Sequence, residues 1–123
     1  AAGENVGSVN VFHRLFERGS LDVAQPSVTK VGGVSELRKV FALAESFAVP
    51  VVPHSPYFGP GLLATLQVAA TFAHDTMIEV SFMDLGASPM GDAIDVIDGH
   101  IAVPPGPGLG RDPDPAIVER YRV

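Results

Sequence analysis

The sequence predicts an α/β fold built on a parallel sheet, and three features carry that prediction. Helical and strand-like patterns alternate along residues 1–83, in the order helix, strand, helix, strand, helix, strand, which is typical of parallel strands joined by crossover helices. Each repeat covers about 25 residues, close to the roughly 30 per unit of a (β/α) barrel of about 250 residues. The 13 glycines and 11 prolines provide sharp turns between short elements. We therefore expect about three βα units in residues 1–83 and a C-terminal arm in residues 84–123.

Two amphipathic helices are expected in the first half of the chain. Ser8 is placed to cap a helix that runs to about Arg18, and Ser35 is placed to cap a second helix after the Gly32-Gly33 turn. In both helices apolar residues recur at three- and four-residue steps, which predicts one buried face each. These residues are Val11, Phe12, Leu15 and Phe16 in the first helix, and Leu37, Val40, Phe41, Ala44, Phe47 and Ala48 in the second.

Three strands and a third helix complete the repeats. The strands are expected at residues 21–29, 49–53 and 77–83, which are rich in β-branched and apolar side chains. A helix of small residues is expected at about 62–74, after a turn-rich loop. In the C-terminal arm we expect a hairpin at 92–103 around Asp98-Gly99, a Pro/Gly segment at 104–110 and a closing helix at 113–121.

The composition excludes several classes of function. The chain has 123 residues, the size of one domain, and a net charge of −6 with only 8 Lys and Arg. Proteins that bind nucleic acid or a membrane surface usually carry a basic patch, and none is visible. The most apolar stretch, residues 61–73, is too short to span a bilayer. The chain has no cysteine, which excludes thiolate chemistry, and a cytoplasmic location is expected.

Four polar residues stand where the strands of a parallel sheet would end. Glu4 precedes the first helix, Ser27 lies near the end of the first strand, His54 follows the second strand, and Glu79 lies in the third. They are 23, 27 and 25 residues apart, one repeat each, and barrel enzymes carry their working residues at the carboxyl ends of strands. Each residue alone has an ordinary structural explanation, such as a helix-entry carboxylate for Glu4. Their common register favours one shared site.

Short motifs around these positions make the pattern more specific. In chain order they are Gly3-Glu4-Asn5, Gln25-Pro26, Lys30-Val31-Gly32-Gly33-Val34, Val52-Pro53-His54-Ser55, Ile78-Glu79 and Pro107-Gly108-Leu109-Gly110. This ordered set closely resembles the second half of the barrel in mandelate racemase-like and acid-sugar dehydratase members of the enolase superfamily, in the mandelate racemase/muconate lactonizing enzyme family. The resemblance implies the C-terminal part of a TIM-like (β/α) barrel, with the N-terminal half of the enzyme as a required partner and a homo-oligomer as the complete form.

The resemblance also implies a role for three of the four residues. Enzymes of this family hold one Mg²⁺ with carboxylates at three successive strand ends, and Glu4 matches the third; the other two would lie upstream. The metal grips a small carboxylate substrate and offsets the negative charge that develops when the proton next to the carboxylate is removed. His54 matches the histidine that acts as general acid or base. Glu79 matches the carboxyl group that hydrogen-bonds the substrate from the side opposite the metal.

Ser27 departs from the family pattern. Members with this histidine normally pair it with an aspartate at the position of Ser27. A serine can orient an imidazole through a hydrogen bond, but it cannot stabilise the charged ring as a carboxylate does. We therefore expect a Mg²⁺-dependent dehydratase of acid sugars or related hydroxy acids, in which His54 acts mainly as an acid and the isolated chain is inactive. The alternatives are a racemase or epimerase of the same family, which needs two competent bases, and a non-catalytic, truncated or degenerate barrel fragment.

Overall fold

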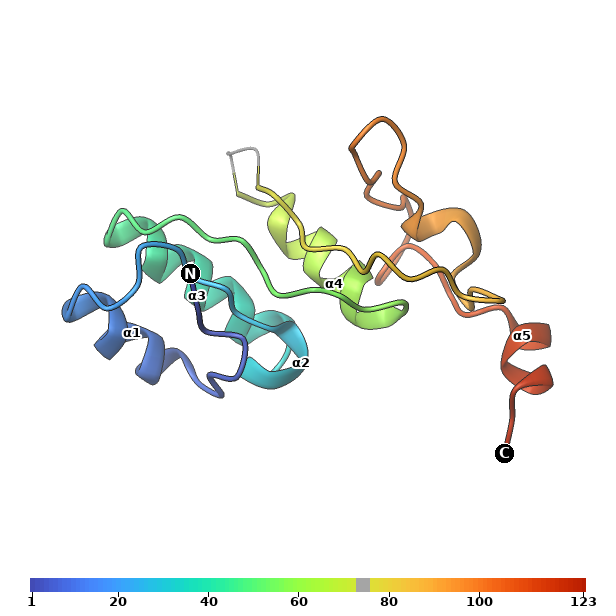
Figure 1. Ribbon diagram of the computed structural model, residues 1–123, viewed down its shortest axis with the longest axis horizontal. Helices are drawn as coiled ribbons and strands as arrows, with labels where there is room; N and C mark the ends of the chain where they lie inside the picture. Colours follow the sequence, from blue (N-terminus) through green and yellow to red (C-terminus); the bar gives the residue numbers. More distant parts are fainter. Residues whose placement is uncertain (73–75) are drawn as a thin grey trace.

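The protein is elongated, with most of its helices in the first half and an irregular arm at its C-terminal end (Figure 1). The computed structural model describes residues 1–72 and 76–123. None of the helices in that part of the chain is long and apolar enough to cross a membrane. The helices are α1 (Val9–Glu17), α2 (Val28–Val31), α3 (Val34–Ser46), α4 (Pro60–Ala69) and α5 (Pro115–Arg120), with a 3₁₀ helix, η1, at Gly91–Ile94.

The main core lies between α1 and α3, which pack side by side (Figure 1). Their predicted apolar stripes supply the buried surfaces, and Phe12 of α1 and Leu37 of α3 are fully buried. Gly33 is the N-cap residue of α3, because its carbonyl accepts the N–H of Leu37 at 2.9 Å. Its φ of 96° is a conformation that favours glycine. Ser35 therefore lies inside the helix, and the prediction that it caps the helix was wrong.

Three extended segments run parallel to one another beside these helices. Single parallel bridges join Ala2 to Ala24 and Ala24 to Val51. The ladder hydrogen bonds continue as far as His54, whose N–H donates to Pro26 O at 3.0 Å. The parallel direction agrees with the α/β class that the repeats predict, although each pairing is an isolated bridge and not a full strand.

The first predicted strand, residues 21–29, ends early. Its centre pairs as described above, but Val28–Val31 form the single helical turn α2. Ser27 is the N-cap residue of this turn, and its carbonyl accepts the N–H of Val31 at 2.9 Å. Gly32 then ends the turn in a left-handed conformation with a φ of 114°. The β-branched side chains favour a strand here, and the flanking serine and glycine outweigh that preference.

The predicted strand at residues 77–83 is extended but unpaired. Within residues 1–72 and 76–123, no backbone hydrogen bond joins it to a neighbouring segment. Four of its seven side chains are exposed, with Met77 71% and Phe82 95% accessible, whereas Ile78 packs against the core. A strand exists only where the backbone groups of a partner line up with its own. The expected pairing therefore appears for two of the three predicted strands.

Helix α4 lies between α3 and the C-terminal arm (Figure 1). It begins earlier than the predicted residue 62, because Pro60 occupies the first turn, where its missing N–H leaves no bond unmade. It ends at Ala69, and His74, the predicted end, lies outside the described residues. Most of its side chains are buried, by α2 and α3 on one side and by the arm on the other.

The C-terminal arm is less regular than predicted. The expected hairpin at residues 92–103 reduces to one antiparallel bridge across the Asp98-Gly99 turn. Both turn residues have positive φ, 49° and 78°, as in a type I′ turn. The start of that range is the 3₁₀ helix η1 instead, so the prediction of a strand there was wrong. The closing helix expected at 113–121 is α5, which the side chain of Asp114 caps.

Candidate active site

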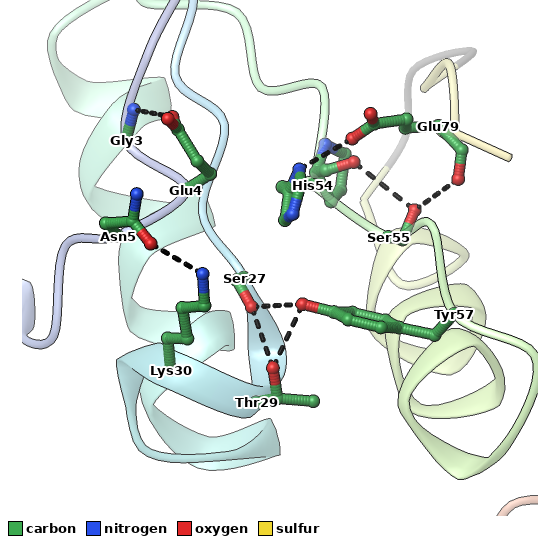
Figure 2. Close-up of polar contacts among 11 residues, drawn as sticks. Gly3, Glu4, Asn5, Ser27, Thr29, Lys30, His54, Ser55, Tyr57 and Glu79 are labelled. Atoms are coloured by element: carbon green, nitrogen blue, oxygen red, sulfur yellow. Dashed lines mark hydrogen bonds and ion pairs between the residues drawn. The ribbon is translucent and has the colours of Figure 1, made fainter. Parts of the chain in front are cut away.

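The carboxyl ends of the three parallel segments lie at one edge of the protein. Glu4, Ser27 and His54 each follow a bridged residue by two or three positions. Because the segments are parallel, these residues are brought to the same end of the sheet. Figure 2 shows His54 between Glu4 on one side and Glu79 on the other. All four predicted positions are thus gathered in one region of the molecule.

His54 and Glu79 form a close pair. His54 Nδ1 lies 2.8 Å from Glu79 Oε2, and the two side chains are 25% and 40% accessible. Oε2 itself is buried, and no described residue gives it a hydrogen bond of good geometry, so the ring approaches it off the ideal direction. The two groups are thus within ion-pair distance, although they do not form a hydrogen bond of good geometry in this structure.

Ser27 contacts two other hydroxyl groups rather than the histidine. Its buried Oγ lies 2.5 Å from Tyr57 Oη and 3.0 Å from Thr29 Oγ1, and Thr29 and Tyr57 are 2.9 Å apart. The three hydroxyls close a triangle (Figure 2). In the described part of the chain Ser27 makes no hydrogen bond to His54. Tyr57 meets His54 instead, ring edge to ring face, with centroids 6.1 Å apart and an interplanar angle of 87°.

Glu4 is held as an anion. Backbone N–H groups of Glu4 and Gly3 lower the pKa of the Glu4 carboxyl below its ordinary value of 4.5, and His54 and Lys30 nearby lower it further against a partial desolvation. The Gly3 N–H donates to Glu4 Oε2 at 3.0 Å. Lys30 of α2 donates to Asn5 Oδ1 at 2.5 Å and so links this helical turn to the segment that carries Glu4.

Sequence reasoning missed three residues of this region, Thr29, Ser55 and Tyr57. Thr29 was assigned to a strand and Tyr57 to a turn-rich loop. Ser55 is fully buried and donates to Glu79 O at 2.8 Å, which ties the end of one segment to another across 24 residues. The available signal was their position, since polar residues just after a strand end lie at the same edge as the strand-end residue.

The described residues offer a metal ion one suitable carboxylate. Among residues 1–72 and 76–123, no three His, Asp or Glu side chains lie close enough to hold a metal. Glu4 has the right chemistry for Mg²⁺, an ionised oxygen donor at the edge of the sheet. It fits the role of one ligand among several, and the other ligands would have to come from outside these residues.

Comparison with known proteins shows the family. Residues 1–117 match the family described as enolase C-terminal domain-like, and the chain belongs to it. It is 34% identical over 125 residues to the D-xylonate dehydratase of Haloferax volcanii, covering 100% of this chain and 30% of that enzyme. It is 32% identical to the D-galactonate dehydratase of Variovorax paradoxus, covering 93% and 32%. The chain therefore spans about a third of the length of these relatives.

Solved structures share the fold. The mandelate racemase/muconate lactonizing enzyme-like protein from Rubrobacter xylanophilus superposes with a TM-score of 0.85 at 30% identity, covering 99% of this chain and 32% of that one. A racemase from Streptomyces coelicolor with bound magnesium superposes with a TM-score of 0.74 at 29% identity, covering 97% and 30%. The chain corresponds to the C-terminal part of these TIM-barrel enzymes, which confirms the predicted family and the broad fold class.

Proposed function

We propose that this chain is the C-terminal part of a Mg²⁺-dependent lyase that dehydrates an acid sugar or a related hydroxy acid. The observation that supports this most is the place of His54, between Glu4 and Glu79 at the ends of parallel segments (Figure 2). A hydroxyl group leaves readily only when it is protonated, and a histidine paired with a carboxylate is a suitable donor. Relatives named as D-xylonate and D-galactonate dehydratases contain the corresponding segment.

The proposed reaction divides the work among the residues. A base outside this chain removes the proton next to the substrate carboxylate. His54 then protonates the hydroxyl on the following carbon, the C–O bond breaks, and its electron pair leaves with the water molecule. The enol that is left rearranges to a 2-oxo acid. Glu79 hydrogen-bonds the substrate from the side away from Glu4.

Glu4 would hold the Mg²⁺ as one of its oxygen ligands. Its carboxyl stays ionised because neighbouring backbone N–H groups lower its pKa, and ionised oxygen donors suit this cation. When bound, the cation supplies positive charge beside the substrate carboxylate. We assign the remaining ligands, and most of the surface that selects the substrate, to the rest of the enzyme.

We also infer that residues 1–83 supply about three βα units of the barrel and residues 84–123 its closing arm. The extended segment at 77–83 supports this, because it has no backbone–backbone hydrogen bond to another described segment, and its exposed apolar side chains suit a strand that pairs with another part of the barrel. We expect the complete enzyme to be a homo-oligomer, as the family resemblance implies, and to be cytoplasmic. Its acidic balance favours small-molecule substrates over nucleic acid or membrane partners.

A racemase or epimerase of the same family is the second candidate. A racemase from Streptomyces coelicolor has the same fold in this region. Such an enzyme needs a second base on the opposite face of the substrate. Ser27 does not meet this need, because its neutral hydroxyl is already bonded to Tyr57 and Thr29. A non-catalytic barrel is the third candidate, and turnover by the complete protein separates it from the other two.

Assays of the full-length enzyme, meaning this chain together with the rest of its barrel, test the proposal. A panel of sugar acids and hydroxy acids is incubated with enzyme and Mg²⁺ in D₂O. A 2-oxo acid product, trapped as its semicarbazone, would support dehydration. Deuterium at the carbon beside the carboxylate without loss of water would favour racemisation. No reaction with any acid, by a folded protein that binds Mg²⁺, would favour the non-catalytic barrel.

A further inference from the structure

We propose that Glu79, and not residue 27, is the carboxylate that positions His54, so that the proton-transferring pair of this site is His54–Glu79. The inference rests on the proposed proton transfer by His54, and it names the group that fixes the tautomer and orientation of the ring. It extends the role of Glu79 beyond contact with the substrate. The argument has three parts: the contact itself, the anchoring of both partners, and the commitment of Ser27 elsewhere.

The contact joins one particular atom of each side chain. His54 Nδ1 lies 2.8 Å from Glu79 Oε2, and that oxygen is buried without a hydrogen bond of good geometry among the described residues. A buried carboxylate oxygen without compensation is costly, and among the described residues the imidazole is the basic group within ion-pair distance that can offset its burial. The side chain of Glu79 is still 40% accessible, which leaves its other oxygen available to the substrate.

Both partners are anchored through their backbones. The N–H of His54 donates to Pro26 O at 3.0 Å, which fixes the histidine at the end of its segment. The neighbouring residue, Ser55, is fully buried and donates to Glu79 O at 2.8 Å. The hydrogen bond from Ser55 to Glu79 O thus fixes the spacing between residues 54 and 79. The two side chains are therefore already close together in the protein without substrate.

At residue 27 the family resemblance implies an aspartate, but the serine found there is already hydrogen-bonded to other groups. The hydroxyl of Ser27 is bonded to Tyr57 and Thr29, and it is fully buried. The ring of Tyr57 lies against His54 and contributes a neutral contact rather than a charge. Among the described residues, the charged groups around the imidazole are Glu79 at Nδ1, with Glu4 and Lys30 farther away on the opposite side.

The pairing determines which ring nitrogen reacts. Beside an ionised Glu79, Nδ1 keeps its proton in both the neutral and the charged ring, because the carboxylate accepts it in either state. Nε2 is then the nitrogen that gains and loses the proton exchanged with the substrate.

Replacing Glu79 in the full-length enzyme tests this assignment. Glu79→Gln keeps the size of the side chain and removes its charge, while Glu79→Ala removes the contact. We expect ¹⁵N NMR of the histidines to show His54 with the proton on Nδ1 in the unmodified enzyme and with the proton redistributed to Nε2 in Glu79→Ala. In Glu79→Gln the limb of the pH–rate profile set by His54 should move to lower pH, because the ring loses the carboxylate beside Nδ1.

A second histidine–glutamate pair provides the matched control. His13 Nδ1 lies 3.5 Å from Glu17 Oε2 on the exposed face of α1. Glu17→Gln removes the same charge there, and it should leave both the His54 signals and the pH limb unchanged. Far-UV circular dichroism establishes that each variant is folded.

Two outcomes would overturn the inference. One is an unchanged His54 tautomer in Glu79→Ala. The other is an unchanged pH limb in Glu79→Gln together with a lower kcat, which would restrict Glu79 to the substrate. The NMR measurement needs no turnover, so failure of the proposed function can be told apart from failure of this inference. If the full-length protein converts no acid but shows the tautomer change, the His54–Glu79 pairing stands and the proposed reaction is wrong.

Discussion

Ser27 Oγ lies 2.5 Å from Tyr57 Oη, at the position where the family resemblance implies an aspartate. Thr29 completes the network with bonds of 3.0 Å to Ser27 and 2.9 Å to Tyr57. A buried hydroxyl without a partner would cost about 1–3 kcal/mol, so the two neighbours make a serine acceptable at this buried position. Because the Ser27 hydroxyl bonds to these neighbours and not to His54, the imidazole has Glu79 as its carboxylate neighbour.

Restoring an aspartate at position 27 is expected to have little effect unless Tyr57 is changed as well. In Ser27→Asp the new carboxylate would accept hydrogen bonds from Tyr57 and Thr29, so the His54 limb of the pH–rate profile should move by less than about one unit. In Ser27→Asp/Tyr57→Phe that competition weakens, and the limb should move to higher pH by about 1–3 units. The measurement is kcat/KM against pH for the full-length enzyme.

The direction of that change also identifies the role of His54. If the protonated ring is required, as in dehydration, activity should persist further into the alkaline range. If the neutral ring is required, as for a base, activity should be lost over a wider acidic range. Equal shifts in the single and double variants would show that Tyr57 does not compete for the new carboxylate.

His54→Asn is expected to remove most activity of the full-length enzyme. Asparagine has a similar size but cannot exchange a proton, and general acid–base catalysis contributes about 10²–10⁴-fold. The quantity to measure is kcat at saturating substrate and Mg²⁺. His13→Asn, on the exposed face of α1, serves as the control and should retain full activity. Comparable rates in the two variants would remove His54 from the proposed mechanism.

The sequence predicted which residues gather at the site better than it predicted their contacts. Glu4, Ser27 and His54 were found because spacing along the chain reports the register of parallel segments, and the bridges at Ala2, Ala24 and Val51 have that register. The pairing of His54 with Glu79 depends on side-chain directions and on the Ser55 bond, which spacing does not encode.

The strands were harder to predict than the helices for a similar reason. An amphipathic helix satisfies its own backbone, so α1 and α3 follow from the local pattern. A strand needs a partner, and the apolar run at 77–83 has none in the described part of the chain. At Val28–Val31 the sequence favours a strand, yet Ser27 and Gly32 supply the ends of a helical turn.

Glu4 is expected to control the Mg²⁺ requirement of the full-length enzyme. Glu4→Gln should raise the Mg²⁺ concentration needed for half-maximal activity by at least about tenfold, because an ionised ligand is replaced by a neutral one. Since neighbouring backbone N–H groups lower the pKa of the Glu4 carboxyl, protons should compete with Mg²⁺ only at a lower pH than they would for an ordinary glutamate. Titration of activity with Mg²⁺ at several pH values measures both effects.

The isolated chain provides a second test of the metal site. With Glu4 as its one suitable carboxylate among the described residues, the chain should bind Mg²⁺ too weakly to detect at micromolar concentrations. Micromolar binding in calorimetry, or an unchanged Mg²⁺ requirement in Glu4→Gln, would show that the site is built from other residues.

Gly3→Ala is expected to destabilise the fold at the segment that carries Glu4. Gly3 has a φ of 126°, and a Cβ there would lie 2.8 Å from the ring of Phe12, which is fully buried in the core. The strained backbone and the clash together should lower the free energy of unfolding by about 2–4 kcal/mol. Gly19→Ala is the control, since Gly19 also has a positive φ of 58° but no atom within 4 Å of the added Cβ. Equal losses for the two variants in denaturant titrations would show that backbone strain alone matters and that the contact with Phe12 does not.

The isolated chain is expected to associate in solution rather than to remain a cooperative monomer. The segment at 77–83 has no backbone–backbone hydrogen bond to another described segment and carries exposed apolar side chains, of which Phe82 is the most exposed, and such an edge pairs readily with another copy. Sedimentation velocity should therefore show a mass that rises with concentration, and Phe82→Lys should reduce that rise by placing a charge on the edge. Val118→Lys, which adds the same charge at an exposed apolar residue of α5, should have less effect. A monomer at every concentration, with a sharp cooperative unfolding transition, would mean that this segment is satisfied within the chain and that residues 77–83 do not form a pairing edge.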